Sequence, residues 1–234
     1  LDLEHELIEG TLSSNMAGLI LYSLDPEKAL PQFVHLREKG LPCVLLDRYS
    51  DQLPMNVATS NNIDGAYQAT EHLIRMGHRK ILFAAHLYPI KTEQLRRRGY
   101  QLALHAYGIE ENPELFVENS DDHFPMICQM IRRGEVTAVV CVHDYLAIRL
   151  LDYLSRHGIS VPGDVSLIGF DGTQAGEYVS PPLTSVYQDF YAMGEAAGRI
   201  LTDLLAQPGG GVRQELLPVR LIVRASTAPP KSAP

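Results

Sequence analysis

Apolar runs and amphipathic stretches alternate along most of the chain, and the clearest example spans residues 137–171. Residues 137–142 are apolar apart from one threonine and rich in β-branched side chains, which predicts a strand covered on both faces. A helix is predicted next, because leucines recur at helical spacing: Leu146, Leu150 and Leu154. Asp144 is its expected N-cap. Residues 165–170 predict a second buried strand that ends at Asp171, which completes a strand–helix–strand unit.

The same alternation continues on both sides of this unit. Further strands are predicted at residues 17–21, 43–46, 55–58, 80–85, 115–117, 185–187 and 216–224. Further helices are predicted at residues 3–12, 27–39, 61–76, 92–107, 124–133 and 190–205. Regular alternation of strands and helices is typical of α/β proteins with parallel sheets, and this is the predicted fold class.

Polar and aromatic residues follow several of the predicted strands. They are Tyr22, Ser23, Asp47, Arg48, His143, Asp144 and Asp171, joined by Arg96, Arg97 and Arg98 in a helix after another strand. The carboxyl ends of parallel strands share one edge of the sheet, where ligands bind in open α/β folds. Carboxylates accept hydrogen bonds and guanidinium groups donate them in pairs, which suits a polyhydroxylated ligand such as a sugar. In the alternative interpretation, which the pattern supports equally, the aspartates only cap helices and the arginines are solvated.

Composition and charge narrow the class of protein. The 234 residues carry a net charge of −8, with 20 Lys+Arg against 28 Asp+Glu. Direct binding of nucleic acid by this chain is therefore not expected. We find no signal-peptide pattern, and no apolar run comes near the roughly 18 residues that a membrane helix needs. The three cysteines are odd in number and widely spaced, so we expect thiols in a cytoplasmic protein without membrane association.

The sequence contains no motif for catalysis, for a cofactor or for a metal site. The histidines show no ligand spacing within one helix, and there is no C-x-x-C, Walker loop, dinucleotide fingerprint or G-x-S-x-G elbow. The pair His143-Asp144 resembles phosphohydrolase-type metal sites, but those lie in all-α domains, whereas here the pair follows a predicted strand. We therefore expect a protein that is not an enzyme and that needs no cofactor or metal.

A series of longer motifs points to one protein family. In chain order they are PCVLLDR at 42–48, GAYQATEHLIRMGHRKILF at 65–83, RRRGYQLALHAYGI at 96–109, AVVCVHDYLAIRLL at 138–151, VPGDVSLIGFD at 161–171, SPPLTSV at 180–186 and LPVRLIVRASTAPP at 217–230. These motifs resemble the lac-repressor/purine-repressor-type (LacI/GalR) family of bacterial transcription regulators. The resemblance covers essentially the whole chain, in family order.

The resemblance implies the effector-binding core of such a regulator, with a periplasmic-binding-protein-like type I fold. Two Rossmann-like lobes with parallel sheets would hold the ligand between them. The implied first lobe is 1–76 plus 183–217, the second is 77–182 plus 218–226, and 227–234 would be a flexible tail. Family members carry a DNA-binding helix-turn-helix, a hinge helix and a strand–helix–strand before the helix with which this chain begins. The first lobe is therefore expected to lack its opening strand–helix–strand.

The resemblance also implies ligand contacts in the second lobe. Asp171 matches the aspartate of the family's G-[FY]-D motif, which binds ligand hydroxyls or an amine. Arg96, three residues before a Gly-Tyr pair, matches the ligand-clamping arginine. Phe124, or His123 beside it, lies where the family places an aromatic ring. His143 departs from the pattern, since the family usually has asparagine before that aspartate, and histidine is larger and titratable.

Other expected contacts lie in or near the first lobe. Asp47 in the L-D-R motif matches a cleft position, and Gln188 in Y-Q-D-F matches a cleft-facing hinge position. Tyr22, which ends a predicted strand, would approach the same ligand.

The function that follows from the resemblance is ligand sensing in a transcriptional regulator, expected to be a repressor. A sugar or polyol effector, with a purine or nucleoside as the second choice, would bind between the lobes and change operator affinity allosterically. The intact protein would be a homodimer that contacts operator DNA through a helix-turn-helix absent from this chain. The alternative is a periplasmic-type sugar-binding protein of a transport system. That class shares the fold but predicts a signal peptide and a monomer, and it does not explain the ending LPVRLIVRAST.

Overall fold

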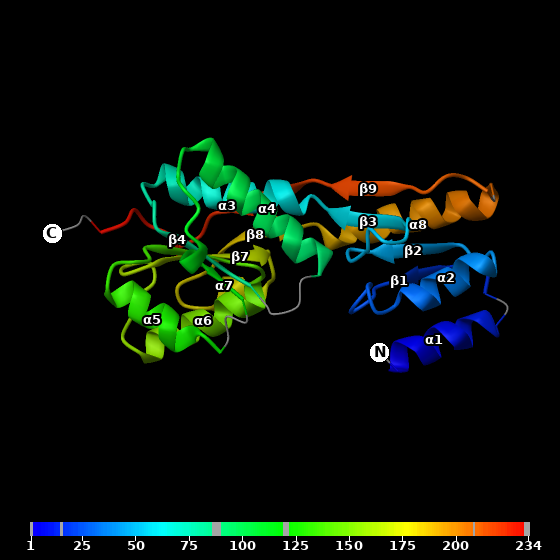
Figure 1. Ribbon diagram of the computed structural model, residues 1–234, viewed down its shortest axis with the longest axis horizontal. Helices are drawn as coiled ribbons and strands as arrows, with labels where there is room; N and C mark the ends of the chain where they lie inside the picture. The colour runs from blue at the N-terminus through cyan, green and yellow to red at the C-terminus, as the bar shows by residue number, and fades with distance from the viewer. Residues whose placement is uncertain (1, 15, 86–89, 119–121, 208, 232–234) are drawn as a thin grey trace. The chain divides into compact units, whose positions relative to one another are not determined.

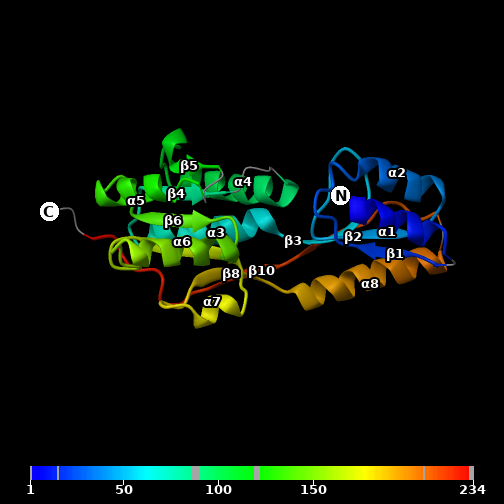
Figure 2. The ribbon, with the colours of Figure 1, turned by 90° about the horizontal axis from the view of Figure 1, so that it is seen from below.

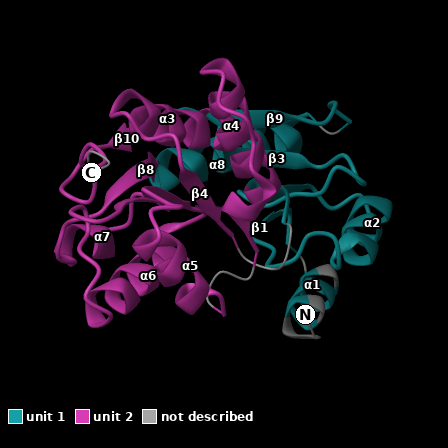
Figure 3. Cartoon of the chain, turned by 60° about the vertical axis from the view of Figure 1, so that its left-hand side comes forward, with its two compact units in different colours: residues 1–61, 90–92, 189–218 teal, residues 62–89, 93–188, 219–234 magenta. Residues whose placement is uncertain are grey.

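The computed structural model describes residues 2–14, 16–85, 90–118, 122–207 and 209–231. The chain divides into two compact units (Figure 3). Unit 1 comprises residues 1–61, 90–92 and 189–218, and unit 2 comprises residues 62–89, 93–188 and 219–234. Among the described residues, no helix is long and apolar enough to cross a membrane.

Unit 1 is built on a four-stranded parallel sheet with the strand order β1-β2-β3-β9. Its strands are β1 (Leu19–Leu21), β2 (Cys43–Leu46), β3 (Asn56–Ser60) and β9 (Gln214–Leu217). Its helices are α1 (Asp2–Leu12), α2 (Leu30–Glu38) and α8 (Phe190–Ala206). Alternate residues of β2 face opposite sides: Leu45 packs with residues of α1 and α2, and Val44 packs with α8. β2, in the interior of the sheet, is therefore buried on both faces, as its apolar sequence predicts.

Unit 2 is built on a six-stranded sheet with the order β10-β8-β7-β6-β4-β5, in which only β10 is antiparallel to its neighbour. Its strands are β4 (Ile81–Ala84), β5 (Phe116–Val117), β6 (Ala138–Cys141), β7 (Ser166–Asp171), β8 (Thr184–Gln188) and β10 (Val219–Ile222). Its helices are α3 (Asn62–Arg75), α4 (Lys91–Ala106), η1 (Pro113–Leu115), α5 (Phe124–Arg132), α6 (Asp144–Arg156) and α7 (Ala175–Tyr178). The two views in Figures 1 and 2 show these helices layered around the sheet.

Helices α3 and α4 approach each other closely, and Gly99 makes this possible. A Cβ at this position would overlap the carbonyl oxygen of Ile63 on α3. Gly65 of α3 lies equally close to the sheet, because a Cβ there would come within 2.8 Å of the Phe170 ring and of Val186. Two glycines thus bring the first turn of α3 close to the middle of α4 and to the strands β7 and β8.

The predicted fold class is confirmed, because both sheets are parallel apart from one edge strand. The predicted strand at 216–224 is wrong, since it is two strands that belong to different sheets. β9 pairs with β3 in unit 1, whereas β10 pairs with β8 in unit 2. Pro218 separates them, and a proline cannot donate a backbone hydrogen bond to continue a ladder.

The boundaries of the units differ from the expected lobe boundaries at 76 and 182. α3 falls in unit 2, because it packs against β7, β8 and β10. β8 also falls in unit 2, because it pairs with β7 on one side and with β10 on the other. Packing of α3 on the second sheet and pairing of β8 within it therefore decide the unit to which these two elements belong.

Part of the segment 227–234, expected to be a flexible tail, contacts unit 2; residues 232–234 lie outside the described part of the chain. The Ala228 carbonyl accepts hydrogen bonds from His78 Nε2 and from Ser166 Oγ, each over 2.9 Å. Lys231 pairs with Asp164 over 2.5 Å. These contacts bind the segment to residues that precede or begin strands of the unit 2 sheet.

Candidate functional site

The carboxyl end of β7 carries an unusual turn. Asp171 has φ 113° and Gly172 has φ 65°, both in the left-handed region that a non-glycine residue such as aspartate seldom adopts. Gly172 fits because a Cβ there would stand only 2.7 Å from Cα of Tyr187. The turn places the partly exposed Asp171 carboxylate at the carboxyl edge of the sheet, where the parallel-strand argument predicted it.

Arg96 of α4 reaches the same edge and is buried, with 5% of its surface exposed. Its Nε donates to Oδ1 of Asn62 over 2.7 Å, and its Nη1 donates to the Val142 carbonyl over 2.7 Å. Nη1 also lies 3.4 Å from Asp171 Oδ1. The guanidinium is stacked on Phe170, 3.8 Å from the ring centroid. This arrangement fixes a planar charge between a carboxylate and an aromatic face.

Gln188 completes a group that we call the carboxyl-edge cluster: Arg96, Asp171, Gln188 and Asn62. Gln188 Nε2 donates to Asp171 Oδ1 over 2.7 Å. Its amide oxygen is buried, and among the described residues it has no hydrogen-bond partner. The cluster therefore combines a carboxylate, a guanidinium and an amide with a buried acceptor, which is a suitable set for binding hydroxyl groups.

His143, and not Asp144, is the N-cap of α6, which corrects the sequence prediction. The His143 Nδ1 accepts a hydrogen bond from the Leu146 backbone N–H over 3.0 Å. An accepting Nδ1 carries no proton, so the neutral ring has its hydrogen on Nε2. The role of His143 as a ligand contact stays a prediction. Because Nδ1 is occupied by the Leu146 N–H, the ring would offer Nε2–H as a donor.

Asp144 lies behind the cluster and is fully buried, with 0% exposure. Its Oδ2 accepts from the backbone N–H of Thr173 over 2.6 Å and from the Thr173 hydroxyl over 2.8 Å. Its Oδ1 accepts from the Ser185 hydroxyl over 2.5 Å. Burial raises the pKa of Asp144, although the hydrogen bonds from Ser185 and Thr173 act in the opposite direction.

Phe124 is placed in the hydrophobic core of unit 2. It is buried at the start of α5, and its ring centroid lies 5.4 Å from that of Tyr153. Packing inside the unit accounts for its aromatic character, so its predicted role against a ligand has no support from these contacts and remains a prediction.

Unit 1 has its own polar group at the carboxyl ends of its strands. Tyr22 follows β1, and the Arg48 guanidinium carbon lies 5.1 Å from its ring centroid. Asp47 follows β2 with φ 64°. Three buried oxygens have no hydrogen-bond partner among the described residues: Ser23 Oγ, Asp47 Oδ1 and Thr59 Oγ1. Buried polar atoms are nearly always paired in folded proteins, so this group is suited to take up water or ligand hydroxyls.

Sequence reasoning missed several members of the site. Asn62, the Val142 carbonyl and the Phe170 ring hold Arg96 in place, and Thr59 lies inside a strand. A signal existed for Asn62, because an asparagine opens the predicted helix that precedes β4. The Val142 carbonyl and the Phe170 ring carry no signal, since an apolar residue at a strand end is ordinary core composition.

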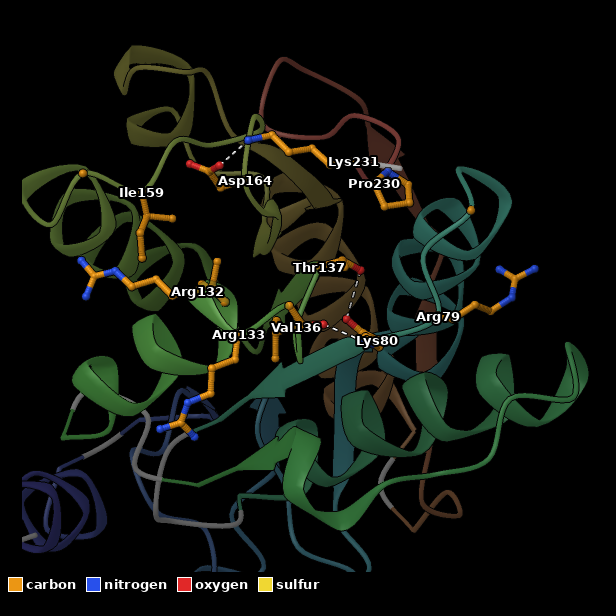
Figure 4. Close-up of a pocket in the computed structure, with 14 residues that line it drawn as sticks. Arg79, Lys80, Arg132, Arg133, Val136, Thr137, Ile159, Asp164, Pro230 and Lys231 are labelled. Carbon is orange, nitrogen blue, oxygen red and sulfur yellow. Dashed lines mark hydrogen bonds and ion pairs between the residues drawn. The ribbon is translucent and has the colours of Figure 1, made fainter. Parts of the chain in front are cut away.

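A large pocket of about 750 Å³ lies in unit 2 at the opposite, amino-terminal edge of the same sheet (Figure 4). Five of its lining residues are basic: Arg79, Lys80, Arg132, Arg133 and Lys231. Arg79 donates to the Ile74 and His78 carbonyls, Lys80 to the Gly134 carbonyl and Arg132 to the His157 carbonyl. Figure 4 shows the guanidinium groups of Arg79, Arg132 and Arg133 pointing apart. These cations complement the carboxyl ends of helices, so the pocket is not the candidate site.

Comparison with known proteins adds an independent finding. Residues 70–227 match the model of the periplasmic-binding-protein-like domain family. The lactose operon repressor of Escherichia coli is 30% identical over 233 residues, which cover 96% of this chain and 62% of the repressor. The chain thus spans less than two thirds of the length of this curated relative.

Two solved structures are similar over nearly all of the chain. A complex of the transcriptional regulator CelR with cellobiose superimposes with a TM-score of 0.85 at 30% identity, covering 97% of this chain and 71% of that one. A LacI-family regulator from Enterococcus faecium with bound ribose superimposes with a TM-score of 0.84 at 26% identity, covering 97% and 85%.

Proposed function

Because the chain belongs to the periplasmic-binding-protein-like family, in the form found in lac-repressor/purine-repressor-type (LacI/GalR) regulators, we propose that it is the effector-binding core of a bacterial transcriptional repressor. Binding of a small effector would shift the core between two conformations that differ in operator affinity. The relatives described above are regulators, which favours this function over that of a sugar-binding protein in a transport system.

The observation that carries the proposal is the carboxyl-edge cluster. Arg96 is buried, its orientation is fixed by Asn62 and Val142, and it faces a carboxylate that Gln188 also contacts. A charged group held so firmly loses little side-chain entropy when a ligand binds, which is the benefit of preorganisation. The unusual backbone of Asp171 supports the same conclusion, since strained residues concentrate at functional sites.

The proposed effector is a neutral sugar or polyol. Vicinal hydroxyls can donate to the Asp171 carboxylate and accept from guanidinium and amide N–H groups, and the relatives with solved ligands hold cellobiose and ribose. In unit 1 the oxygens of Ser23, Asp47 and Thr59 are buried acceptors that would pair with further hydroxyls. We propose that each of these two groups, considered within its own unit, offers hydrogen-bonding partners for a sugar. A purine or nucleoside is the second candidate and is included in the test.

Operator DNA would be contacted outside this chain, because the net charge of −8 disfavours binding to a phosphate backbone. We propose a homodimer whose helix-turn-helix domains bind paired half-sites, since two-fold operators require a two-fold protein. The place of action would be the cytoplasm. There the three buried cysteines, which are free thiols, would stay reduced.

The test is a thermal-shift screen of the chain with pentoses, hexoses, cellobiose, lactose and purines. A ligand present at about 100 times its Kd adds about 2.7 kcal/mol of stability. For a protein of this size the melting temperature should then rise by roughly 5–10 °C. A rise with one sugar that is lost in Arg96→Ala supports the proposal. The absence of any shift over the whole panel contradicts it.

A further inference from the structure

The carboxylate of Asp144 connects three separate parts of unit 2. It belongs to the first turn of α6, and it accepts hydrogen bonds from Thr173, which follows the turn after β7, and from Ser185 of β8. Ser185 Oγ in turn accepts from the Gly172 backbone N–H over 3.0 Å. Both residues that follow Asp171 are therefore held, directly or through Ser185, by this one carboxylate.

The backbone of β7 is shaped to admit this carboxylate. A Cβ at Gly169 would overlap Asp144 Oδ1, so any other residue there would displace the carboxylate or the strand. Gly169 lies two residues before Asp171, on the strand that carries the cluster. The contact places a carboxyl oxygen of Asp144 directly against the strand that ends at Asp171.

Burying a carboxylate to hold a turn costs free energy of folding. Burial raises the pKa of Asp144, which means that the charged form is disfavoured in the folded chain. Because the pKa of Asp144 is higher in the folded chain than in the unfolded chain, its titration favours folding most at low pH. This part of the stability is lost as the pH rises through the folded pKa. Such a cost in the core is typical of residues that serve a site rather than the fold.

We propose that Asp144 is the positioning residue of the effector site: through Thr173 and Ser185 it holds the turn at Asp171 and Gly172 in its left-handed conformation. The Asp171 carboxylate is thereby kept within reach of Arg96 and Gln188. Asp144 itself would not touch the effector. The inference rests on the proposed function only where it calls Asp171 an effector contact.

The first test is hydrogen exchange of individual backbone amides in the chain without ligand. Asp144→Asn keeps the side-chain shape but replaces one accepting oxygen by an N–H₂ donor, so it cannot accept all three bonds. Exchange at Gly172 and Thr173 should become faster by about ten- to a hundredfold, because Asp144 is the acceptor for the Thr173 amide and holds Ser185, the acceptor for the Gly172 amide. Amides of Leu167 and Gly169 within β7 should keep their rates.

Two further variants sharpen this test. Thr173→Val removes the hydroxyl bond but leaves the backbone bond to Asp144, so a smaller acceleration is expected at the same amides. Asp152→Asn, on the exposed side of the same helix and paired with Arg156, should change neither amide. Unchanged exchange at Gly172 and Thr173 in Asp144→Asn, or equal acceleration throughout β7, would overturn the proposal.

The second test is a double-mutant cycle for sugar affinity, measured by calorimetry with cellobiose and with ribose. Asp144→Asn should weaken binding in the parent chain but have little further effect in an Asp171→Asn background, because it acts through Asp171. Additive losses would show a purely structural role and contradict the proposal. If neither sugar binds the parent chain, the proposal that these sugars are effectors fails. The hydrogen-exchange result then decides by itself whether Asp144 positions the turn.

Discussion

Arginines occur at both edges of the unit 2 sheet, and they differ in their burial and in the groups to which they donate hydrogen bonds. At the carboxyl edge, Arg96 is buried, stacked on Phe170 and directed at a carboxylate and a side-chain amide. At the amino edge, Arg79 and Arg132 are exposed and donate to backbone carbonyls near the ends of helices.

The difference shows that neither pocket size nor the number of charges identifies a site. The amino-edge pocket is large and basic, yet its cations satisfy carbonyls that every helix leaves unpaired. The carboxyl-edge cluster contains one buried cation whose position is fixed by its neighbours, and it leaves a carboxylate partly exposed. Fixed orientation and unpaired acceptors, and not net charge, distinguish a binding group from a helix cap.

The largest effect is expected for Arg96→Ala. The variant removes a charged donor from the site and leaves Asn62 and the Val142 carbonyl without their partner. Charged hydrogen bonds contribute about 1.5–3 kcal/mol each, so effector affinity should fall by about ten- to a hundredfold. The free energy of unfolding should fall by about 2–3 kcal/mol as well.

Calorimetry with the effector and urea unfolding measure these two quantities for Arg96→Ala. Arg132→Ala is the matched control, because it removes an arginine from the other edge of the same sheet. An affinity equal to that of the parent would show that Arg96 serves only the fold.

A smaller effect is expected for Asn62→Ala, which removes the acceptor that orients Arg96 but leaves the charge. The guanidinium can then adopt other rotamers, and fixing it on binding costs about 0.5–1.5 kcal/mol. Affinity should therefore fall by about three- to tenfold. Titration calorimetry checks this, with Arg75→Ala on the exposed side of the same helix as control. A loss as large as that of Arg96→Ala would contradict a purely orienting role.

The amino edge should lose stability as the pH falls, which is opposite in sign to the effect of Asp144 behind the carboxyl edge. Burial lowers the pKa of His78 below its usual 6.5, and its ring holds the carboxy-terminal segment through the Ala228 carbonyl. A lowered folded pKa means that the unfolded chain takes up the proton first. Stability is therefore present above about pH 6.5 and lost as pH falls toward the folded pKa.

Melting temperatures of the chain, measured from about pH 7.5 down to the lowered pKa of His78, should fall across this range. The fall should be reduced in His78→Gln, which keeps a donor for the Ala228 carbonyl but does not titrate. His72, whose pKa burial also lowers, contributes in the same direction. An identical fall in the parent and in His78→Gln would exclude His78 as the source.

The smallest effect is expected for Arg132→Ala. It removes a hydrogen bond to the His157 carbonyl at the end of α6, on an exposed side chain. The free energy of unfolding should change by less than about 1 kcal/mol, and sugar affinity should not change. Chemical denaturation and calorimetry check both statements. A loss of sugar affinity in this variant would place ligand chemistry at the amino edge and break the distinction between the two edges.

Much of the fold could be predicted from the sequence because parallel strands are apolar along their whole length. The runs at 43–46 and 137–142 stand out for this reason, and a parallel sheet brings the residues after its strands to one edge. The proximity of Asp171 to the end of β6 follows from that rule alone. The family motifs implied that Asp171 and Arg96 both contact the ligand, but they did not imply the contact between the two side chains.

The remaining parts of the site depend on packing between segments far apart in the chain. His143 and Asp144 could each cap α6, and the choice is made by Gly169, which leaves room for the Asp144 carboxylate behind β7. Asn62 meets Arg96 only because Gly99 allows α3 and α4 to close together. A helical or strand pattern reports one segment's own periodicity, so it cannot show such contacts.

The central claim is that the effector is bound at the carboxyl edge of the unit 2 sheet. Calorimetric titration of Asp171→Asn and Asp164→Asn tests it most directly, because these aspartates lie at opposite ends of β7 and each contacts one cation. The sugar used is the one that raises the melting temperature of the parent most. Asp171→Asn should lose about ten- to a hundredfold in affinity, while Asp164→Asn should bind as the parent does. Equal affinities in both variants, or a loss confined to Asp164→Asn, would contradict the account.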